Sequence, residues 1–507
     1  MLLGLRRIVG RVLPPMPRLD RRSRWILGAL LAAGLVLRLG WGVFIAEPPA
    51  SGACRNTPQG CHLHDPVLYQ ILAGNIAGGD GYSYGPGLDQ GETAFYPPGY
   101  PMTIGALEWV VDKTPFNPSP FGQEVGLNIV LSVATIAAMF ELGRRLVSPT
   151  VGLIAAGLFA FWPNLIVYSG VPLTETLFLL LFTLMLLVAL ASPEVVRAPG
   201  RWRMVTTGVL FGALVMVRPT SIVVAPLFVL LWWRVGLATA VKRAALVGAA
   251  SLLLILPWTA RNFTRMDSFV LISTNMGDNM CIGNHPGATG AYEVPPYCNL
   301  GTQGDASEQL CLEPDPAKRA SLPSRCRRPE VEIIRQDDNV DLALKHIREE
   351  PLGFFTKMPA KLRWTLDRDT DGLWAATDYG QQEPLSPKRM DLVELITNGY
   401  YAVVGVVSLA GVALLLVRQD AARRRLFFIG AALIQLVPPL VTFGDARFKM
   451  PIYPAMAVAA AVAVVAALQR RMPDPDVIRE WPSADPQPEA ETTAAAQDPE
   501  IEAVPVA

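Results

Sequence analysis

The chain has little charge and no excess of either sign. Only 17% of its 507 residues are charged, whereas about a quarter are charged in soluble proteins. Lys and Arg together equal Asp and Glu at 44 each, so there is no net positive charge to attract nucleic acid. Hydrophobic residues make up 51% of the sequence, and long apolar runs alternate with short arginine-rich ones. This alternation is typical of a protein that crosses a membrane many times.

Ten apolar runs are predicted to be membrane-spanning helices. The stretch 204–233 is interrupted at Arg218-Pro219, and a single helix of that length would reach roughly 45 Å, well beyond about 30 Å of hydrocarbon. Two short spans joined at this step also keep the arginine clusters on one side, as the positive-inside rule requires. We therefore expect an all-α polytopic bundle with both ends cytoplasmic, whose spans are residues 25–45, 125–146, 151–168, 172–191, 204–217, 221–233, 244–258, 392–417, 426–443 and 451–468.

This topology divides the chain into regions. The membrane region 25–260 contains a first extracytoplasmic loop at 47–124, and the C-terminal spans lie in 391–471. Between them, the extracytoplasmic segment 261–390 forms a cap, with amphipathic helices expected at 330–350 and 352–366. Residues 1–24 are a basic cytoplasmic segment, and the first apolar run is too long for a typical secretory signal. Residues 472–507, rich in Pro, Ala and acids, are expected to be a disordered cytoplasmic tail.

The few cysteines are confined to the two extracytoplasmic segments, which predicts disulfides in an oxidising compartment. Cys54 and Cys61 form the natural local pair, and three pairings are open to the other four. A metal site at Cys61, with His62, His64 and Asp65, is the alternative, but the spacing matches no known zinc motif. The other four cysteines are Cys281, Cys298, Cys311 and Cys326.

Two acids at the outer boundary are candidate catalytic groups. Asp65 precedes a helical apolar pattern at 66–76, so it either caps a short surface helix or serves a site. Glu175 is the only charge in the span 172–191, and an acid there is costly unless it faces protein or water. Its alternative role is that of a structural partner for a cation such as Arg218 or Arg38.

Cations from separate outer turns accompany these acids. Arg218, Arg261 and Arg447 each lie at the outer end of a different predicted span, and Lys449 follows Arg447 closely. Arginine clamps phosphate well because its planar guanidinium donates two parallel hydrogen bonds and stays charged. Each cation alone could be a terminal residue that extends toward the membrane surface. Together they predict a phosphate site handled from the outer side, built by Arg218, Arg261, Arg447 and Lys449.

Several motifs resemble one family of membrane enzymes. HDPVLYQILAGNIAGGDGYS at 64–83, FYPPGYPM at 95–102, LTE at 173–175 and ARFKMPIYP at 446–454 follow one another in a characteristic order. PWTARN at 257–262 and STNMGDNMCIGN at 273–284 are also similar to bacterial members. The chain thus resembles the family 39-like glycosyltransferases of the GT-C superfamily, which are related to protein O-mannosyltransferases and aminoarabinose transferase.

The resemblance implies a GT-C-type helical bundle and a site at its outer face. A sugar would pass from a polyprenyl-phosphate donor to an acceptor hydroxyl with inversion, in the bacterial inner membrane. Asp65 matches the family's general base, Glu175 its second acid and Arg447 the cation near the lipid phosphate. The chain has a lone HDP in place of an adjacent acidic pair, and it lacks the mannosyltransferases' MIR-type repeats, so a protein acceptor is not implied. Possible substrate contacts from the same motifs are His64, Tyr96, Asn275 and Asn284.

Some questions stay open at this stage. No cofactor is expected, because no Gly-rich phosphate loop stands between a strand and a helix; a divalent cation remains an alternative. A flippase or transporter of an anionic lipid-linked glycan would use similar side chains, but it predicts mid-membrane charges and internal repeats that the sequence lacks. The sugar, the choice among a glycan, lipid or protein acceptor, an oligosaccharide donor and the oligomeric state are not determined by the sequence.

Overall fold

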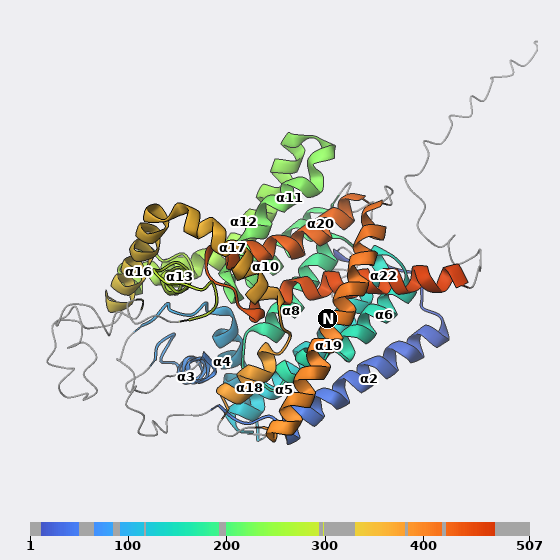
Figure 1. Cartoon of the computed structure of the whole chain (residues 1–507), viewed down its shortest axis with the longest axis horizontal. Helices are drawn as coiled ribbons and strands as arrows, with labels where there is room; N and C mark the ends of the chain where they lie inside the picture. Colours follow the sequence, from blue (N-terminus) through green and yellow to red (C-terminus); the bar gives the residue numbers. More distant parts are fainter. Residues whose placement is uncertain are drawn as a thin grey trace, which may run out of the picture.

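The structure is a helical bundle elongated along one axis (Figure 1). The computed structural model describes residues 12–49, 65–84, 92–115, 118–191, 199–293, 298, 330–380, 384–417 and 422–471. Within these ranges the chain forms helices and three isolated bridges but no strand, which confirms the predicted all-α class.

The first half of the described chain supplies most of the membrane bundle. Ser119 and Ser148 cap α5 and α6 with their side chains, and each is followed by a proline in the first turn, where no backbone N–H is missed. The helices are α2 (Arg21–Phe44), α3 (Asp65–Gly78), α4 (Gly99–Val111), α5 (Pro120–Leu146), α6 (Pro149–Ala160), α7 (Pro163–Tyr168), α8 (Glu175–Ala189), α10 (Arg201–Val217), η1 (Pro219–Val224), α11 (Ala225–Trp232), η2 (Trp233–Val235) and α12 (Leu237–Met266).

The second half supplies the cap and the last spans. The amphipathic helices expected at 330–350 and 352–366 are present as α16 and α17. The elements are α13 (Met276–Gly283), α16 (Glu330–Glu349), α17 (Pro351–Leu366), α18 (Asp371–Asp378), α19 (Pro387–Val417), α20 (Ala422–Leu433), η7 (Ile434–Leu436), α21 (Val437–Val441), η8 (Ala446–Ile452) and α22 (Tyr453–Arg471).

The chain is a multi-pass membrane protein, although the predicted count of ten spans is not confirmed. Six helical stretches of the described chain are long and apolar enough to cross a membrane: Arg21–Phe44, Pro120–Leu146, Leu237–Met266, Pro387–Leu416, Arg424–Val441 and Ala446–Gln469. Shorter apolar helices lie at Pro149–Ala160, Glu175–Ala189 and Pro219–Val235.

Two prolines decide where the helices break. The helix expected over 151–168 is interrupted, because Trp162 is extended before Pro163 and separates α6 from α7. The predicted interruption of 204–233 is correct, since Arg218 is extended (φ −137°, ψ 98°) before Pro219. This break places the Arg218 side chain at the end of α10 instead of inside a continuous helix.

Small residues allow the membrane helices to pack closely. α19 lies along α22, and α5 lies along α6 and α8. A Cβ atom at Gly411 of α19 would stand only 1.8 Å from the carbonyl oxygen of Ala459 in α22, so only glycine permits this approach. Large apolar side chains such as Phe44 of α2 and Leu409 of α19 are 84% and 71% exposed, as expected of helix faces that contact lipid.

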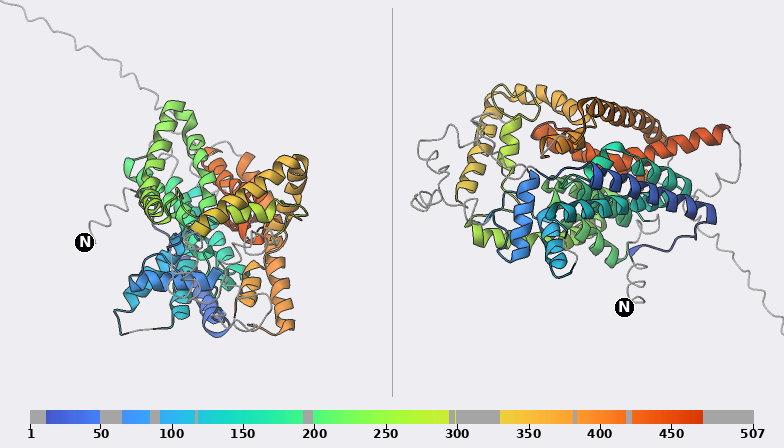
Figure 2. Two further views of the ribbon diagram at one scale, coloured as in Figure 1. Left: turned by 90° about the vertical axis from the view of Figure 1, so that its left-hand side faces the viewer. Right: turned by 90° about the horizontal axis from the view of Figure 1, so that it is seen from below.

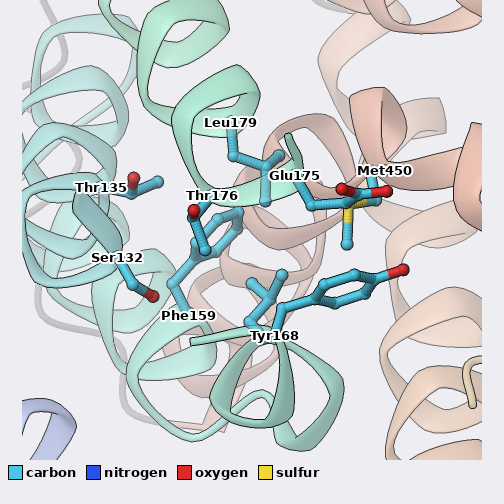
Figure 3. Close-up of a pocket in the computed structure, with 9 residues that line it drawn as sticks. Ser132, Thr135, Phe159, Tyr168, Glu175, Thr176, Leu179 and Met450 are labelled. Carbon is cyan, nitrogen blue, oxygen red and sulfur yellow. The ribbon is translucent and has the colours of Figure 1, made fainter. Parts of the chain in front are cut away.

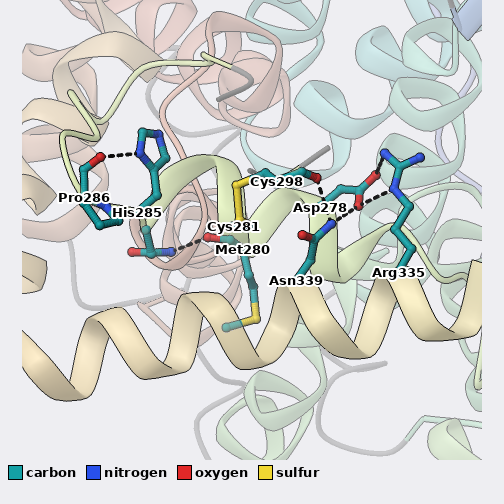
Figure 4. The surroundings of a disulfide bond; sticks show 9 residues. Asp278, Met280, Cys281, His285, Pro286, Cys298, Arg335 and Asn339 are labelled. Carbon is teal, nitrogen blue, oxygen red and sulfur yellow. Dashed lines mark hydrogen bonds and ion pairs between the residues drawn. A yellow bond between two sulfur atoms is a disulfide. The ribbon is translucent and has the colours of Figure 1, made fainter. Parts of the chain in front are cut away.

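The cap is held together beside a disulfide (Figure 4). Cys281 of α13 is bonded to Cys298, which confirms a disulfide in this segment. Nearby, the Asp278 carboxylate accepts hydrogen bonds from Arg335 at 3.1 and 2.5 Å and from Asn339 at 2.7 Å, which docks α13 on α16. The other cysteines for which we predicted bridges lie outside the described residues: Cys54, Cys61, Cys311 and Cys326.

Candidate active site

Asp65 is the first residue of α3, and its carboxylate is shared between two neighbours. The Tyr96 hydroxyl donates to Oδ1 at 2.7 Å, and Arg447 Nη1 lies 3.3 Å from Oδ2. Burial, reinforced by the charge of Asp65, raises the pKa of Tyr96 well above its usual range, so this hydroxyl stays protonated and donates. The Tyr96 ring packs edge-on against Tyr69, with 4.8 Å between centroids. Asp65 is therefore oriented from both sides.

Arg447 connects the two acids. It lies in η8, where the Asp445 side chain accepts from its backbone N–H at 2.8 Å and fixes the start of the element. Its Nη1 contacts Asp65, and its Nε donates to Glu175 Oε1 at 2.9 Å. A single guanidinium thus joins residues that are 382 and 272 positions away in the sequence.

Arg218 completes the cluster from the break between α10 and η1. Its Nη2 donates to Glu175 Oε1 at 2.6 Å, and its Nη1 donates to the backbone oxygen of Arg447 at 3.3 Å. The guanidinium also lies 5.0 Å from the centroid of the Phe178 ring, within the range of a cation–π contact. We call Asp65, Glu175, Arg218 and Arg447 the charged cluster.

Exposure separates the roles of the two acids. The side chain of Asp65 is 28% exposed, whereas that of Glu175 is completely buried. Glu175 forms ion pairs with Arg218 and Arg447, so it does serve as the structural partner of cations that the sequence analysis considered as its alternative role. Of the two cations named there, Arg218 is a partner and Arg38 is not. Arg38 instead donates to Ser132 at 2.6 Å and to backbone carbonyls. Of the two acids, only Asp65 can meet a substrate in this conformation.

A small cavity lies on the buried side of Glu175 (Figure 3). Its volume is about 10 Å³, close to the least that holds one water molecule. The cavity is too small for a sugar, so it belongs to the interior behind the cluster and not to a substrate pocket. Its lining residues are Ser132, Thr135, Phe159, Leu165, Tyr168, Glu175, Thr176, Leu179 and Met450.

Lys449 does not join the charged cluster as expected. Its side chain is completely buried between two carboxylates, with Nζ 3.0 Å from Asp371 Oδ1 and 3.3 Å from Asp369 Oδ1. It also donates to the backbone oxygen of Ala446 at 2.9 Å. Its ammonium is thus enclosed, which corrects the prediction that it faces a donor phosphate. The sequence reasoning overlooked both aspartates, although DRDTD at 367–371 is a conspicuous run of acids.

Lys449, Asp369 and Asp371, which we call the Lys449 triad, anchor η8, the element that carries Arg447. Asp369 accepts from Trp162 Nε1 at 2.8 Å and from the Tyr453 hydroxyl, while Asp371 accepts from the Tyr168 hydroxyl at 2.5 Å. Burial raises the pKa of Asp369 to about 6, with Lys449 opposing the shift. The pKa of Asp371 lies below its ordinary value, because Lys449 and the hydrogen bond from Tyr168 outweigh the upward effect of burial.

Arg261 is held by the segment between α3 and α4 instead. It donates to the backbone oxygens of Thr93 at 2.6 Å and Tyr82 at 2.8 Å, and it forms an ion pair with Glu92. Its guanidinium also stacks 4.9 Å from the Trp258 ring. Among the described residues it contacts no member of the charged cluster, because the first loop takes up its donors. The prediction that three arginines surround one phosphate therefore reduces to Arg218 and Arg447.

The possible substrate contacts divide between the site and the cap. Tyr96 contacts Asp65 directly. Asn284 is buried in the cap, where its Oδ1 accepts from Lys361 Nζ at 2.9 Å and its Nδ2 donates to the Val441 carbonyl at 2.7 Å. Asn275 precedes α13 and accepts from Ser273 at 3.0 Å. His64 lies outside the described residues. In the part of the chain that is described, no group of three or more His, Cys, Asp or Glu could hold a metal ion.

No family model and no curated protein matches the sequence of this chain. Solved structures resemble its fold. The archaeal oligosaccharyltransferase AglB from Archaeoglobus fulgidus, in complex with an inhibitory peptide and a dolichol-phosphate, is 14% identical over 92% of this chain with a TM-score of 0.47. The apo form of the Archaeoglobus fulgidus oligosaccharyltransferase is 12% identical over 89% of this chain, with a TM-score of 0.48. ArnT from Cupriavidus metallidurans, bound to undecaprenyl phosphate, is 15% identical over 90% of this chain, with a TM-score of 0.37.

The matched lengths differ between these structures. This chain spans about half of the archaeal chains, 53% and 52%, and 81% of the ArnT chain.

Proposed function

We propose that this protein is an integral-membrane glycosyltransferase with Asp65 as its general base. A sugar passes from a polyprenyl-phosphate donor to an acceptor hydroxyl on the extracytoplasmic face of the bacterial inner membrane. The acceptor is a glycan, a lipid or a protein. The observation that carries the proposal is the charged cluster, which combines one accessible carboxylate with two arginines drawn from distant parts of the chain.

The geometry suits an inverting displacement. Asp65 Oδ2 would take the proton of the acceptor hydroxyl while its oxygen bonds to the anomeric carbon. The bond between that carbon and the phosphate oxygen breaks on the opposite face, and its electron pair leaves with the lipid phosphate. Tyr96 fixes the orientation of Asp65 by donating to Oδ1. Oδ2, which contacts Arg447, would then also accept from the acceptor hydroxyl.

Arg218 and Arg447 retain donors for the departing phosphate. A guanidinium carries five N–H groups. Arg447 uses two of them, on Asp65 and Glu175. Arg218 uses three, on Glu175, on the backbone oxygen of Arg447 and on the Thr174 hydroxyl at 3.3 Å. The remaining N–H groups can stabilise the charge that develops on the phosphate as the bond breaks. Arg261 and Lys449 have no place in this proposal, because their donors are bound elsewhere.

The proposal is tested with Asp65→Asn in the full-length protein in proteoliposomes. The donors are polyprenyl-phosphate monosaccharides labelled in the sugar, and membranes of the source organism supply the acceptor. Turnover should fall by about 10²–10⁴-fold, while donor binding is largely kept because the phosphate contacts belong to the arginines. Asp80→Asn is the matched control: Asp80 is exposed just beyond the end of α3, and its side chain forms no hydrogen bond or ion pair in the described chain, so its loss should leave turnover unchanged.

Two outcomes would contradict the proposal. Near-native sugar transfer by well-folded Asp65→Asn protein would remove Asp65 from the base role. Rapid movement of the labelled lipid across the bilayer, with no sugar transfer by the unmutated protein, would identify a transporter instead.

A further inference from the structure

A basic cleft lies at the end of the bundle remote from Asp65. α5 is 27 residues long and spans about 40 Å. Near its beginning Glu124 accepts from Gln70 of α3, and near its end Arg144 donates to the backbone oxygen of Pro17 at 2.6 Å. Figure 2 shows the dark-blue beginning of α2 at the end of the molecule opposite to the gold α16. The cleft has a volume of about 550 Å³ and is lined by Met16, Pro17, Arg18, Leu19, Arg24, Glu141, Arg144 and Arg145.

The cleft carries an excess of positive charge. Among the described residues that line it, Glu141 is the only acid, and this carboxylate lies 3.3 Å from Arg144 and 2.6 Å from Arg145. Arg18 and Arg24 are exposed and have no ion pair within the described ranges. Four arginines against one glutamate leave three positive charges around one opening.

Two arginines in this corner of the fold each have one nitrogen without an acceptor. Arg145 and Arg203 are only 9% and 4% exposed, and the Nη1 atom of each is buried without a hydrogen-bond partner. Arg203 does donate through Nε to the backbone oxygen of Val12 at 2.6 Å, so it belongs to the same corner of the fold. An unsatisfied buried donor is costly, and these two neighbouring arginines add to the positive charge behind the cleft.

We propose that this cleft binds the phosphate headgroup of an anionic phospholipid in the leaflet remote from Asp65. Guanidinium groups suit phosphate oxygens, which accept from several N–H groups at once. Met16, Pro17 and Leu19 add apolar surface beside the arginines. Trp25 and Trp202, adjacent in sequence to Arg24 and Arg203, are 70% and 49% exposed. Tryptophans of this kind mark the level of the lipid headgroups, so the acceptor is assigned to a lipid.

Lipid binding to the purified full-length protein tests this assignment. Delipidated protein in neutral detergent is titrated with phosphatidylglycerol, and bound lipid is counted by native mass spectrometry. The unmutated protein should prefer phosphatidylglycerol to phosphatidylcholine of the same chain length. The double variant Arg18→Gln/Arg24→Gln should bind phosphatidylglycerol about 30-fold more weakly, given the usual contribution of two arginines at an anionic lipid surface.

The matched control removes the same charge beside the cleft. Arg21 and Arg22 are exposed in the first turn of α2 but do not line the cleft, so Arg21→Gln/Arg22→Gln should bind lipid as the unmutated protein does. Thermal unfolding of both double variants shows whether either is misfolded. Equal weakening by both, or equal binding of the two lipids, would overturn the site. Inorganic phosphate that binds with the same dependence on Arg18 and Arg24, while phosphatidylglycerol does not, would overturn its assignment to a lipid.

Discussion

The buried carboxylate of Glu175 holds two arginines in place, so its removal should weaken the fold as well as the site. Its Oε1 accepts from Arg218 at 2.6 Å and from Arg447 at 2.9 Å, and its side chain is completely buried. Glu175→Gln preserves the shape and one oxygen acceptor but removes the negative charge. Two largely buried guanidinium groups, 14% and 19% exposed, would then repel each other across a neutral amide.

The magnitude follows from the burial of the pair. Removing one partner of a buried ion pair costs about 3–5 kcal/mol. Because glutamine still accepts a hydrogen bond of ordinary strength, we expect a loss of about 3 kcal/mol in the free energy of unfolding. Donor affinity should fall together with the rate of transfer, since both arginines are displaced, whereas Asp65→Asn should mainly lower the rate.

Glu124→Gln is a control matched in burial but opposite in electrostatics. Glu124 lies in the second turn of α5 and is also completely buried, yet its described partner is the amide of Gln70 at 2.6 Å and not a cation. Removal of a buried carboxyl that has no cation should leave stability unchanged or raise it. Unfolding of both variants in detergent, followed by tryptophan fluorescence, measures the difference. Equal stability of the two variants would refute the view that Glu175 is an electrostatic anchor.

Two further predictions concern groups outside the charged cluster. Burial raises the pKa of Glu108 in α4 to about 7, and the charge of Asp112 adds to the shift. The protonated Glu108 is therefore favoured in the folded protein. Its contribution to stability is complete below the ordinary pKa of 4.5 and is lost as the pH rises through 7. The free energy of unfolding should therefore be lower at pH 8 than at pH 5 by about 1–2 kcal/mol, since Glu108 is only partly shielded from solvent. Glu108→Gln should abolish this difference, and an unchanged pH dependence would contradict the assignment. Lys449→Met leaves two buried aspartates without their cation and should cost about 3–5 kcal/mol in thermal or chemical unfolding. Adding Asp371→Asn should recover part of that loss, and a more severe double variant would count against the triad.

Local signals in the sequence were sufficient for the membrane character and for several breaks in the chain. A helix satisfies its own backbone in lipid, so a long apolar run predicts a spanning helix without reference to its neighbours. The extended residue before Pro219 is a similarly local effect, which is why the break at Arg218 could be predicted. The same rule applied to Pro163 would have divided the span 151–168. The cap helices α16 and α17 were likewise visible as amphipathic patterns.

The partners of the charged side chains were decided only by the tertiary structure. Arg261 and Arg447 look alike in sequence, since each lies at one end of an apolar run, yet one pairs with Glu92 and the other with Asp65 and Glu175. Lys449 follows Arg447 by two residues but points into a buried pair of aspartates. An ion pair depends on which helix ends meet in space, and the spacing of residues along one segment contains no information on that meeting. For this reason the sequence alone determined which residues carry charge at the ends of the apolar runs, and the packing of the bundle determined which of them come together.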